Sequence, residues 1–268
     1  MTPSPDVILA GIPGWGGARH TKLRGGLTNM TWHVAHGEHA GVLKIDEDRR
    51  EEPFNTRSAE AAVQTLAAKA GLAPKVLFAR DGVYLTEYVE GTVWKRGSFA
   101  TKANIELLAA ALKRVHSLPL TGRSFDAMSA AKRYAEKIRH LDSDIISSGI
   151  DIIARKRRPN NLCCCHNDLV AENLISTPNL MFLDWEYACD NDPFFDLATV
   201  VEHHELNDSQ AVLFLDAYFD GDGRRWRESL EKNRKLYLAL LLLWMASRPD
   251  SNADEVKSVE ERFVTSCF

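Results

Sequence analysis

The chain has 268 residues, of which 45% are hydrophobic and 26% are charged. This balance is typical of a soluble globular protein with one large or two modest cores, and it excludes a chain that is disordered by composition. The net charge of -4 provides no basic field for a nucleic acid, so no such partner is expected.

The cysteines and the hydropathy of the sequence indicate which covalent links, metal sites and membrane segments to expect. The five cysteines are odd in number and lack paired C-x-x-C spacing, so we expect reduced thiols and neither a disulfide framework nor a zinc site. In a strand, the adjacent Cys163, Cys164 and Cys165 would alternate faces as small apolar fillers. The N-terminal segment lacks the pattern of a signal peptide, and the best apolar run, 236–245, is shorter than the roughly 20 residues that cross a membrane. We therefore expect a cytoplasmic protein with no membrane partner.

The first third of the chain predicts strands and one helix. Residues 1–17 contain many Pro and Gly, which indicates a cap or a loose start. After them, β-rich runs between turn residues predict strands at 20–23, 30–35, 41–45, 75–78 and 83–89. An apolar stripe predicts a helix over 56–70, and an Asp-Gly turn makes the last two strands a hairpin.

Two features of this region are candidates for phosphate binding. Gly25 and Gly26 would let the backbone approach phosphate, and Thr28 and Asn29 offer hydrogen-bond donors. Lys44 lies late in a predicted strand between apolar residues, so its side chain would point away from theirs. Taken alone, the glycine turn could merely join two strands, and Lys44 could be an exposed strand lysine.

From residue 101 the pattern becomes helical. Apolar faces predict helices at 103–118, 127–148, 151–158 and 194–205. Pro119 would stop the first of these helices and Gly149 the second. The apolar run 236–245 reads as a buried helix.

The most informative stretch is 162–186. Asp168 is followed five residues later by Asn173, and Asp184 closes an apolar run. Phosphoryl transfer from a nucleotide uses this layout: Asp168 would orient the acceptor hydroxyl and take its proton, while Asn173 and Asp184 supply the oxygen ligands that Mg²⁺ prefers. Each residue alone could simply cap a turn, but the three together beside strand-like runs indicate a site.

The same stretch carries a family resemblance. The segments His166-Asn167-Asp168-Leu169, Glu172-Asn173, Asp184-Trp185-Glu186-Tyr187, Asp192-Pro193 and Phe195-Asp196-Leu197-Ala198 resemble the bacterial choline kinase branch of the aminoglycoside phosphotransferase and choline kinase superfamily. The resemblance is dense over 162–198 and sparser elsewhere. It implies an α+β, bilobal, protein-kinase-like fold. A small lobe at 1–89 would hold an antiparallel sheet and one helix, and a larger, mainly helical lobe would occupy 90–268.

The resemblance also implies ATP and Mg²⁺ as cofactors and assigns the nucleotide contacts. The glycine turn is similar to the nucleotide loop of the family. Lys44 would bind the α- and β-phosphates and would be held by an ion pair with Glu60. Glu87, Tyr88 and Val89 would form the hinge whose backbone binds adenine.

Several residues around the motif are expected to be structural. His166 would hold its loop as a neutral imidazole, and Asn167 would shape that loop. Asp192 would start the helix at 194–205, and Asp196 would brace the loop from inside this helix. His116 is expected to pack, because a histidine at this place is common in the family as a packing residue.

Choline would need a particular kind of pocket. A quaternary ammonium cannot donate a conventional hydrogen bond, so aromatic faces and negative charge must recognise it. The candidate residues are Glu186, Tyr187, Glu202, Trp226 and Trp244, although each aromatic ring could instead belong to the core. In the family, a late helix carries two tryptophans three residues apart. Here Trp244 fits the second position, and Leu241 occupies the first.

The expected reaction is ATP-dependent phosphorylation of a small alcohol that bears a cationic group, with choline first and ethanolamine next. Thiamine and aminoglycoside phosphotransferases are the chemical alternatives. A nucleotide-binding pseudokinase that acts as a scaffold is the alternative of another class. The sequence leaves the oligomeric state and the number of metal ions open.

Overall fold

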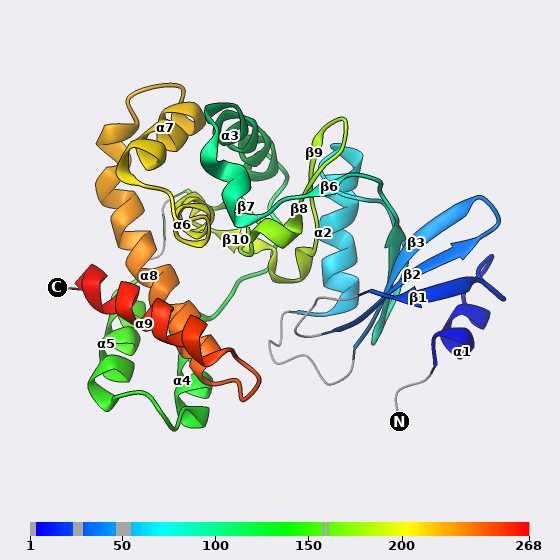
Figure 1. Ribbon diagram of the computed structural model, residues 1–268, viewed down its shortest axis with the longest axis horizontal. Helices are drawn as coiled ribbons and strands as arrows, with labels where there is room; N and C mark the ends of the chain where they lie inside the picture. The colour runs from blue at the N-terminus through cyan, green and yellow to red at the C-terminus, as the bar shows by residue number, and fades with distance from the viewer. Residues whose placement is uncertain (1–3, 24–28, 47–54, 157–158, 160, 268) are drawn as a thin grey trace. The chain divides into compact units, whose positions relative to one another are not determined.

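The computed structural model describes residues 4–23, 29–46, 55–156, 159 and 161–267 (Figure 1). The chain divides into two compact units, the first formed by 1–94 with 172–188 and the second by 95–171 with 189–268. The predicted α+β class, with an antiparallel N-terminal sheet and a mainly helical second part, is confirmed. The domain boundary predicted between residues 89 and 90 stays a prediction.

The first unit is built on a five-stranded antiparallel sheet. Its strands are β1 (Arg19–Lys22), β2 (Asn29–His36), β3 (His39–Asp46), β4 (Val76–Arg80) and β5 (Val83–Glu87), in the order β1-β2-β3-β5-β4. The single predicted helix is α2 (Arg57–Lys69), which begins after Thr56, whose hydroxyl accepts a hydrogen bond from the Ala59 amide. All five predicted strands and this helix are therefore confirmed.

The start of the chain caps the core of this sheet. Pro5 opens the short helix α1 (Pro5–Ala10), where its missing N–H costs nothing. Apolar residues of α1 and of the turns after it pack with residues of the sheet; the cluster comprises Ile8, Leu9, Ile12, Trp15, Ala18, Val34, Leu43, Ile45, Val83 and Leu85. The cap predicted for 1–17 is confirmed for residues 4–17, which is the part of this range that the structure describes.

A second, smaller sheet completes the first unit. Its strands are β6 (Thr92–Val93), β8 (Leu174–Ser176) and β9 (Leu180–Phe182), in the order β6-β8-β9. The 3₁₀ helices η2 (Ala171–Asn173) and η3 (Trp185–Tyr187) flank the β8-β9 hairpin, and η3 contacts α2. The Phe182 amide donates to the Leu72 carbonyl at 2.8 Å, which ties β9 to the turn after α2. The hairpin between Asn173 and Asp184 thus belongs to the same unit as Lys44.

The second unit is mainly helical. Its helices are η1 (Arg96–Ala100), α3 (Lys102–His116), α4 (Ala127–Lys137), α5 (Ser143–Ala154), α6 (Pro193–His203), α7 (Asp208–Phe219), η4 (Gly223–Trp226), α8 (Arg227–Ala246) and α9 (Ala253–Cys267). The largely buried α8 contacts α4, α5, α6 and α9, which makes it the centre of the helical packing (Figure 1). Two short antiparallel strands, β7 (Cys163–Cys165) and β10 (Cys189–Asn191), flank the loop that contains Asp168.

One helix boundary was predicted wrongly. The helix expected over 127–148 is interrupted at 138–142, where Ile138 has extended backbone angles and the Asp142 carboxylate caps α5 by accepting from the Asp144 amide. Gly149 does not stop α5, which runs on to residue 154. A side chain at Gly149 would contact Leu243 of α8, so this buried glycine marks close helix packing instead of a helix end.

In the part of the chain that the structure describes, no helix has the length and apolar character of a membrane span. The apolar run 236–245 lies in α8 and is largely buried among the other helices, as predicted.

The second unit buries two adjacent histidines at the end of α6. Burial lowers the pKa of His203 to about 4, and the nearby cations Arg96 and Arg262 lower it further. Burial also lowers the pKa of His204 to about 3, with a smaller contribution from His203. The His204 ring lies against Phe99, with centroids 4.1 Å apart. Both imidazoles are therefore neutral at pH 7 in the folded protein.

Gly41→Ala should destabilise the first unit. The new Cβ would lie 2.9 Å from the Thr86 carbonyl oxygen and 3.1 Å from the Trp15 ring, so the cap and β5 would both have to shift. We expect the free energy of unfolding to fall by about 1–3 kcal/mol in urea titrations followed by tryptophan fluorescence. Gly16→Ala is the control, because its Cβ would meet nothing closer than 4.0 Å. Equal stability of the two variants would contradict the packing of Trp15 on the sheet.

The histidine pair should make stability depend on pH. Between the ordinary pKa of 6.5 and the lowered values of about 4 and about 3, the unfolded chain binds protons that the folded chain does not. Stability should therefore fall as the pH drops from 6.5 to 4, by about 1 kcal/mol per pH unit for each histidine. Thermal unfolding midpoints across this range should fall less steeply for His204→Asn than for the wild type. The exposed His140→Asn is the control and should keep the wild-type slope.

Candidate active site

Lys44 and Asp184 form the central contact of the first unit. The neighbours of Lys44 on β3, Leu43 and Ile45, are buried in the core, so the lysine points to the other face of the strand. Its Nζ lies 2.8 Å from Asp184 Oδ1, and both side chains are largely shielded from solvent. Asp184 follows β9 with a left-handed backbone (φ 60°), a conformation that aspartate adopts more readily than most residues. The pair joins two segments that are 140 residues apart in the sequence.

The charges around Lys44 keep it protonated. Burial by itself would lower the pKa of this lysine, but the carboxylates of Asp184, Glu60 and Glu186 outweigh burial and raise its pKa above the ordinary value. A fixed cation at the centre of three carboxylates suits a group that binds phosphate. The same carboxylates make the surroundings of Asp184 favourable for a cation.

The predicted ion pair between Lys44 and Glu60 is replaced by a different pairing. Glu60 is fully buried and binds Arg57, one turn earlier on α2, at 2.7 Å. The Arg57 guanidinium also binds Asp46 and lies over the Tyr84 ring, 5.4 Å from its centroid. Glu60 therefore acts on Lys44 through its charge, while Arg57 holds the Glu60 carboxylate. The spacing of Arg57 and Glu60 on one helix face was the signal in the sequence for this pair.

Asn173 and Asp184 lie at the same end of the β8-β9 hairpin. The Leu183 amide donates to the Asn173 carbonyl at 2.8 Å, next to the ladder pair Leu174 and Phe182. This pairing makes Asn173 and the residue before Asp184 cross-strand neighbours. Their side-chain oxygens are hard donors of the kind that Mg²⁺ prefers, and Asp184 already contacts one cation, Lys44. The residues at this end of the hairpin thus fit a magnesium ion.

Asp168 lies on a braced loop of the second unit. The Asp196 carboxylate accepts the His166 amide at 2.8 Å and the Asn167 amide at 2.7 Å, so the predicted bracing by Asp196 is confirmed. His204 Nε2 donates to the Leu169 carbonyl at 3.3 Å from the other side. The backbone on both sides of Asp168 is therefore held by buried groups.

Asn167 has a larger structural role than the sequence indicated. Its backbone is left-handed (φ 65°), and its side-chain amide donates to the Cys165 carbonyl at 3.3 Å. Its side-chain oxygen accepts from Asn191 at 2.8 Å, and Asn191 in turn accepts from Lys156 at 3.0 Å. These contacts fix the turn into Asp168. Asn191 was not singled out in the sequence, because only the β7-β10 pairing brings it there.

The surroundings of Asp168 include a buried tyrosine. Burial raises the pKa of Tyr237 on α8, and the charge of Asp168 raises it further, so the phenol stays neutral near the carboxylate. Asn173 and Asp184 belong to the other unit, and the meeting of Asp168 with them stays a prediction.

Only part of the predicted nucleotide-binding set can be placed. Gly25, Gly26 and Thr28 lie outside the described residues, and Asn29 is described only as the first residue of β2, opposite Asp46. The predicted role of this turn in phosphate binding is therefore an expectation from the sequence.

The hinge candidates follow the end of β5. The Glu87 amide donates to the Lys75 carbonyl at 2.8 Å, and the Tyr88 amide donates to the Ala40 carbonyl at 3.0 Å. Both amides are thus used inside the first unit. The predicted contact between the Val89 backbone and an adenine ring stays a prediction.

The acceptor candidates belong to both units. Glu202 is buried and forms ion pairs with Arg234 at 2.5 Å and Arg262 at 3.5 Å, so its charge is neutralised within the second unit. Glu186 and Tyr187 lie in η3 of the first unit, where Glu186 is buried and acts on Lys44. Both glutamates are therefore engaged by cations of their own unit, and the contact of these candidates with a cationic acceptor stays a prediction.

The two candidate tryptophans differ in their surroundings. Trp226 stacks on Phe219, with centroids 4.4 Å apart, and also contacts Phe194, which indicates a packing role. Trp244 is half-buried on α8, and the Arg248 guanidinium lies 5.1 Å from its ring centroid. The Arg225 guanidinium lies 4.7 Å from the Trp226 ring centroid, so a cation contacts each of the two rings.

Known proteins resemble both the sequence and the fold. The chain is 29% identical over 207 residues to protein LicA of Haemophilus influenzae, covering 72% of this chain and 61% of that protein, so it spans less than two thirds of this relative. It is 28% identical over 203 residues to a thiamine kinase of Salmonella typhi, covering 70% of this chain and 69% of that one. A choline/ethanolamine kinase family protein from Mesorhizobium loti has a similar crystal structure, with a TM-score of 0.75 at 25% identity, covering 98% of this chain and 92% of that one.

The family assignment follows from the extent of these matches. Residues 19–229, most of the chain, match the phosphotransferase enzyme family. The match includes both the Lys44 strand and the Asp168 loop, which lie in different units. The resemblance to the bacterial choline kinase branch is confirmed, and the chain belongs to the phosphotransferase enzyme family.

Proposed function

We propose that the chain transfers a phosphoryl group from ATP to the hydroxyl of choline, or of ethanolamine. The observation that carries this proposal is the shielded Lys44 and Asp184 pair, a phosphate-binding cation beside a cation-binding carboxylate in one compact unit. The braced loop of Asp168 in the second unit supports the proposal. The choice of acceptor follows the likeness to the choline/ethanolamine kinase family protein of Mesorhizobium loti.

Asp168 would act directly on the acceptor hydroxyl. The transition state of phosphoryl transfer is loose, so catalysis depends on positioning and on charge stabilisation. Asp168 would accept a hydrogen bond from the acceptor hydroxyl, orient it and take its proton. The hydrogen bonds that hold His166, Asn167 and Leu169 would fix the carboxylate in place for this role.

Lys44, Asn173 and Asp184 would hold the nucleotide phosphates and magnesium. Mg²⁺, bound by Asn173 and Asp184, would supply positive charge to the phosphate oxygens. Lys44 would leave Asp184 for the phosphates, while the nearby Glu60 charge keeps the lysine protonated. The Val89 backbone would bind the adenine ring.

We assign the aromatic contact for a cationic acceptor to Trp244, because Trp226 already stacks on Phe219. A guanidinium already lies over the Trp244 ring, and an ammonium group could take the same place. Trp226 and Glu202 support such a contact less well, because a neighbouring ring and two arginines already engage them. Recognition would then rely on aromatic surface more than on negative charge.

Thiamine is the second candidate acceptor, and the match to the thiamine kinase of Salmonella typhi favours it. Thiamine also carries a cationic ring and a primary hydroxyl, so the same catalytic groups could act on it. A panel of choline, ethanolamine, thiamine and aminoglycosides with ATP and Mg²⁺, read by product mass, separates these acceptors. Nucleotide binding without any phosphorylated product would favour the scaffold alternative.

Asp168→Asn should abolish most of the turnover. An amide cannot take the proton of the hydroxyl, so we expect kcat to fall about 10²–10⁴-fold with the best acceptor of the panel. Nucleotide affinity, measured by calorimetry, should stay within a few-fold of the wild type. Asp81→Asn is the control, because Asp81 lies in the exposed turn between β4 and β5. A rate near that of the wild type in Asp168→Asn would refute the assignment of the base.

Lys44→Met should weaken the use of ATP. The variant loses a buried cation that no other group replaces, so we expect kcat/KM for ATP to fall about 10²–10³-fold. The control is Lys69→Met, at the exposed end of α2. If both variants kept the wild-type kcat/KM, Lys44 would be only a structural partner of Asp184.

A further inference from the structure

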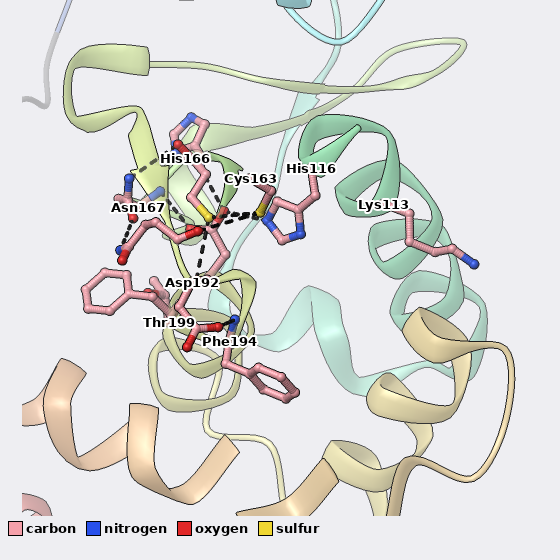
Figure 2. Close-up of polar contacts among 12 residues, drawn as sticks. Lys113, His116, Cys163, His166, Asn167, Asp192, Phe194 and Thr199 are labelled. Atoms are coloured by element: carbon pink, nitrogen blue, oxygen red, sulfur yellow. Dashed lines mark hydrogen bonds and ion pairs between the residues drawn. The ribbon is translucent and has the colours of Figure 1, made fainter. Parts of the chain in front are cut away.

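Two cysteines and a histidine meet in the second unit. Cys163 and Cys165 lie on β7, and His116 lies at the end of α3. One ligand atom from each of the three residues lies within 4.8 Å of the other two, and the sulfurs of Cys163 and Cys165 are 3.5 Å apart. Figure 2 shows Cys163 beside the His116 ring. None of the three is needed for the proposed phosphoryl transfer.

The strand geometry explains why the two sulfurs share a face. Side chains two residues apart on a strand point to the same side, so Cys163 and Cys165 converge while Cys164 points to the opposite side. Cys165 is fully buried and Cys163 is half-buried, so the cluster can be reached from the Cys163 side. The Cys165 thiol contacts the Asp192 carbonyl oxygen at 3.6 Å, and the Cys163 thiol contacts the Asn191 carbonyl oxygen at 3.9 Å.

His116 is oriented in the manner of a metal ligand. Its Nε2 lies 3.0 Å from Asp196 Oδ2, and its Nδ1 lies 2.6 Å from the Tyr218 hydroxyl. Metal-binding histidines almost always pair their second nitrogen with a carboxylate, a carbonyl or a water, which fixes the tautomer and raises ligand basicity. The ring is buried, and two neighbours hold its plane. To bind an ion, the His116 ring would give up one of these two contacts and keep the other as its second partner.

We propose that His116, Cys163 and Cys165 bind one thiophilic metal ion of the Zn²⁺ class. Two thiolates and one imidazole suit Zn²⁺, Co²⁺ or Cu⁺, whereas Mg²⁺ and Ca²⁺ require oxygen donors. Three protein ligands leave a fourth position for water or a further group. On binding, the two thiols release their protons to solvent, and the sulfurs give up their contacts with the two carbonyls.

The site is connected to the Asp168 loop through two short links. Cys165 is followed in the chain by His166 and Asn167, whose amides bind Asp196. The same Asp196 carboxylate contacts His116. A bound ion would fix β7 and the end of α3 around this carboxylate, so the expected effect is stabilisation of the second unit.

Cobalt titration of the reduced, chelator-treated full-length chain tests the proposal. Co²⁺ bound to two thiolates gives a sulfur-to-cobalt charge-transfer band in the near ultraviolet, which oxygen ligands such as Asn173 and Asp184 do not give. We expect this band to saturate at one ion per chain, and Zn²⁺ to remove it by displacing Co²⁺. Zn²⁺ should also raise the thermal unfolding midpoint, because an ion that binds only the folded state stabilises that state.

Variants on the same strand supply the matched controls. Cys163→Ala and Cys165→Ala should lose the band, and His116→Gln should weaken Co²⁺ binding at least tenfold, on the scale that ligand-supporting residues show. Cys164→Ala, on the other face of β7, and Cys267→Ala, on α9, should keep the band. Circular dichroism without metal checks that each variant folds; if Cys165→Ala does not fold, the comparison of Cys163→Ala with Cys164→Ala decides. Absence of the band in the wild type, or its loss in Cys164→Ala to the same extent as in Cys163→Ala, would overturn the site.

Discussion

The buried carboxylate of Asp196 is the constraint around which the second unit is arranged. A carboxylate in the interior must be matched by donors, since an unpaired one would destabilise the fold by several kcal/mol. Asp196 is matched by two consecutive backbone amides, those of His166 and Asn167, and by the His116 ring. Asp196 lies in the first turn of α6, and Asp192 caps the start of this helix. A movement of the loop would therefore break the hydrogen bonds to Asp196 or disturb the start of α6. The packing of α6 therefore holds the backbone that leads into Asp168.

The first unit also contains shielded charges that need partners, and here the charges include two cations. Lys44 and Arg57 are two shielded cations, and Asp46, Glu60 and Asp184 are the carboxylates paired with them. Arg57 binds two of the carboxylates, which leaves Asp184 as the ion-pair partner of Lys44. A lysine held by one carboxylate can exchange it for phosphate more readily than a lysine held by two. Arg57 thus keeps Glu60 in place as a source of charge without occupying Lys44.

The sequence predicted the parts of this protein that depend on local pattern. The five strands of the N-terminal sheet, α2, the cap at Asp192 and the bracing by Asp196 follow from periodicity, capping residues and the family motif. The break at 138–142 was missed because nothing in the local sequence outweighs the helical pattern, and because Gly149 serves helix packing instead of termination. The contact between Arg57 and Asp46 was missed because these two residues meet only through the fold, whereas the spacing of Arg57 and Glu60 on α2 was visible in the sequence. Glu202 was misjudged for the same reason, since Arg234 and Arg262 neutralise it from α8 and α9.

The proposed site for a thiophilic ion and the proposed site for magnesium differ in their donor atoms. Without C-x-x-C spacing the cysteines suggested no metal site, but a C-x-C strand supplies two thiols on one face, and α3 brings a histidine to them. The hairpin end at Asn173 and Asp184 offers only hard oxygen donors, whereas His116, Cys163 and Cys165 offer softer nitrogen and sulfur donors. Donor type separates Mg²⁺ from Zn²⁺ more reliably than affinity does, because affinity for divalent ions follows a common order at most sites. Under the two proposals, the chain would hold a catalytic and a structural ion at once, each selected by the chemistry of its own ligands.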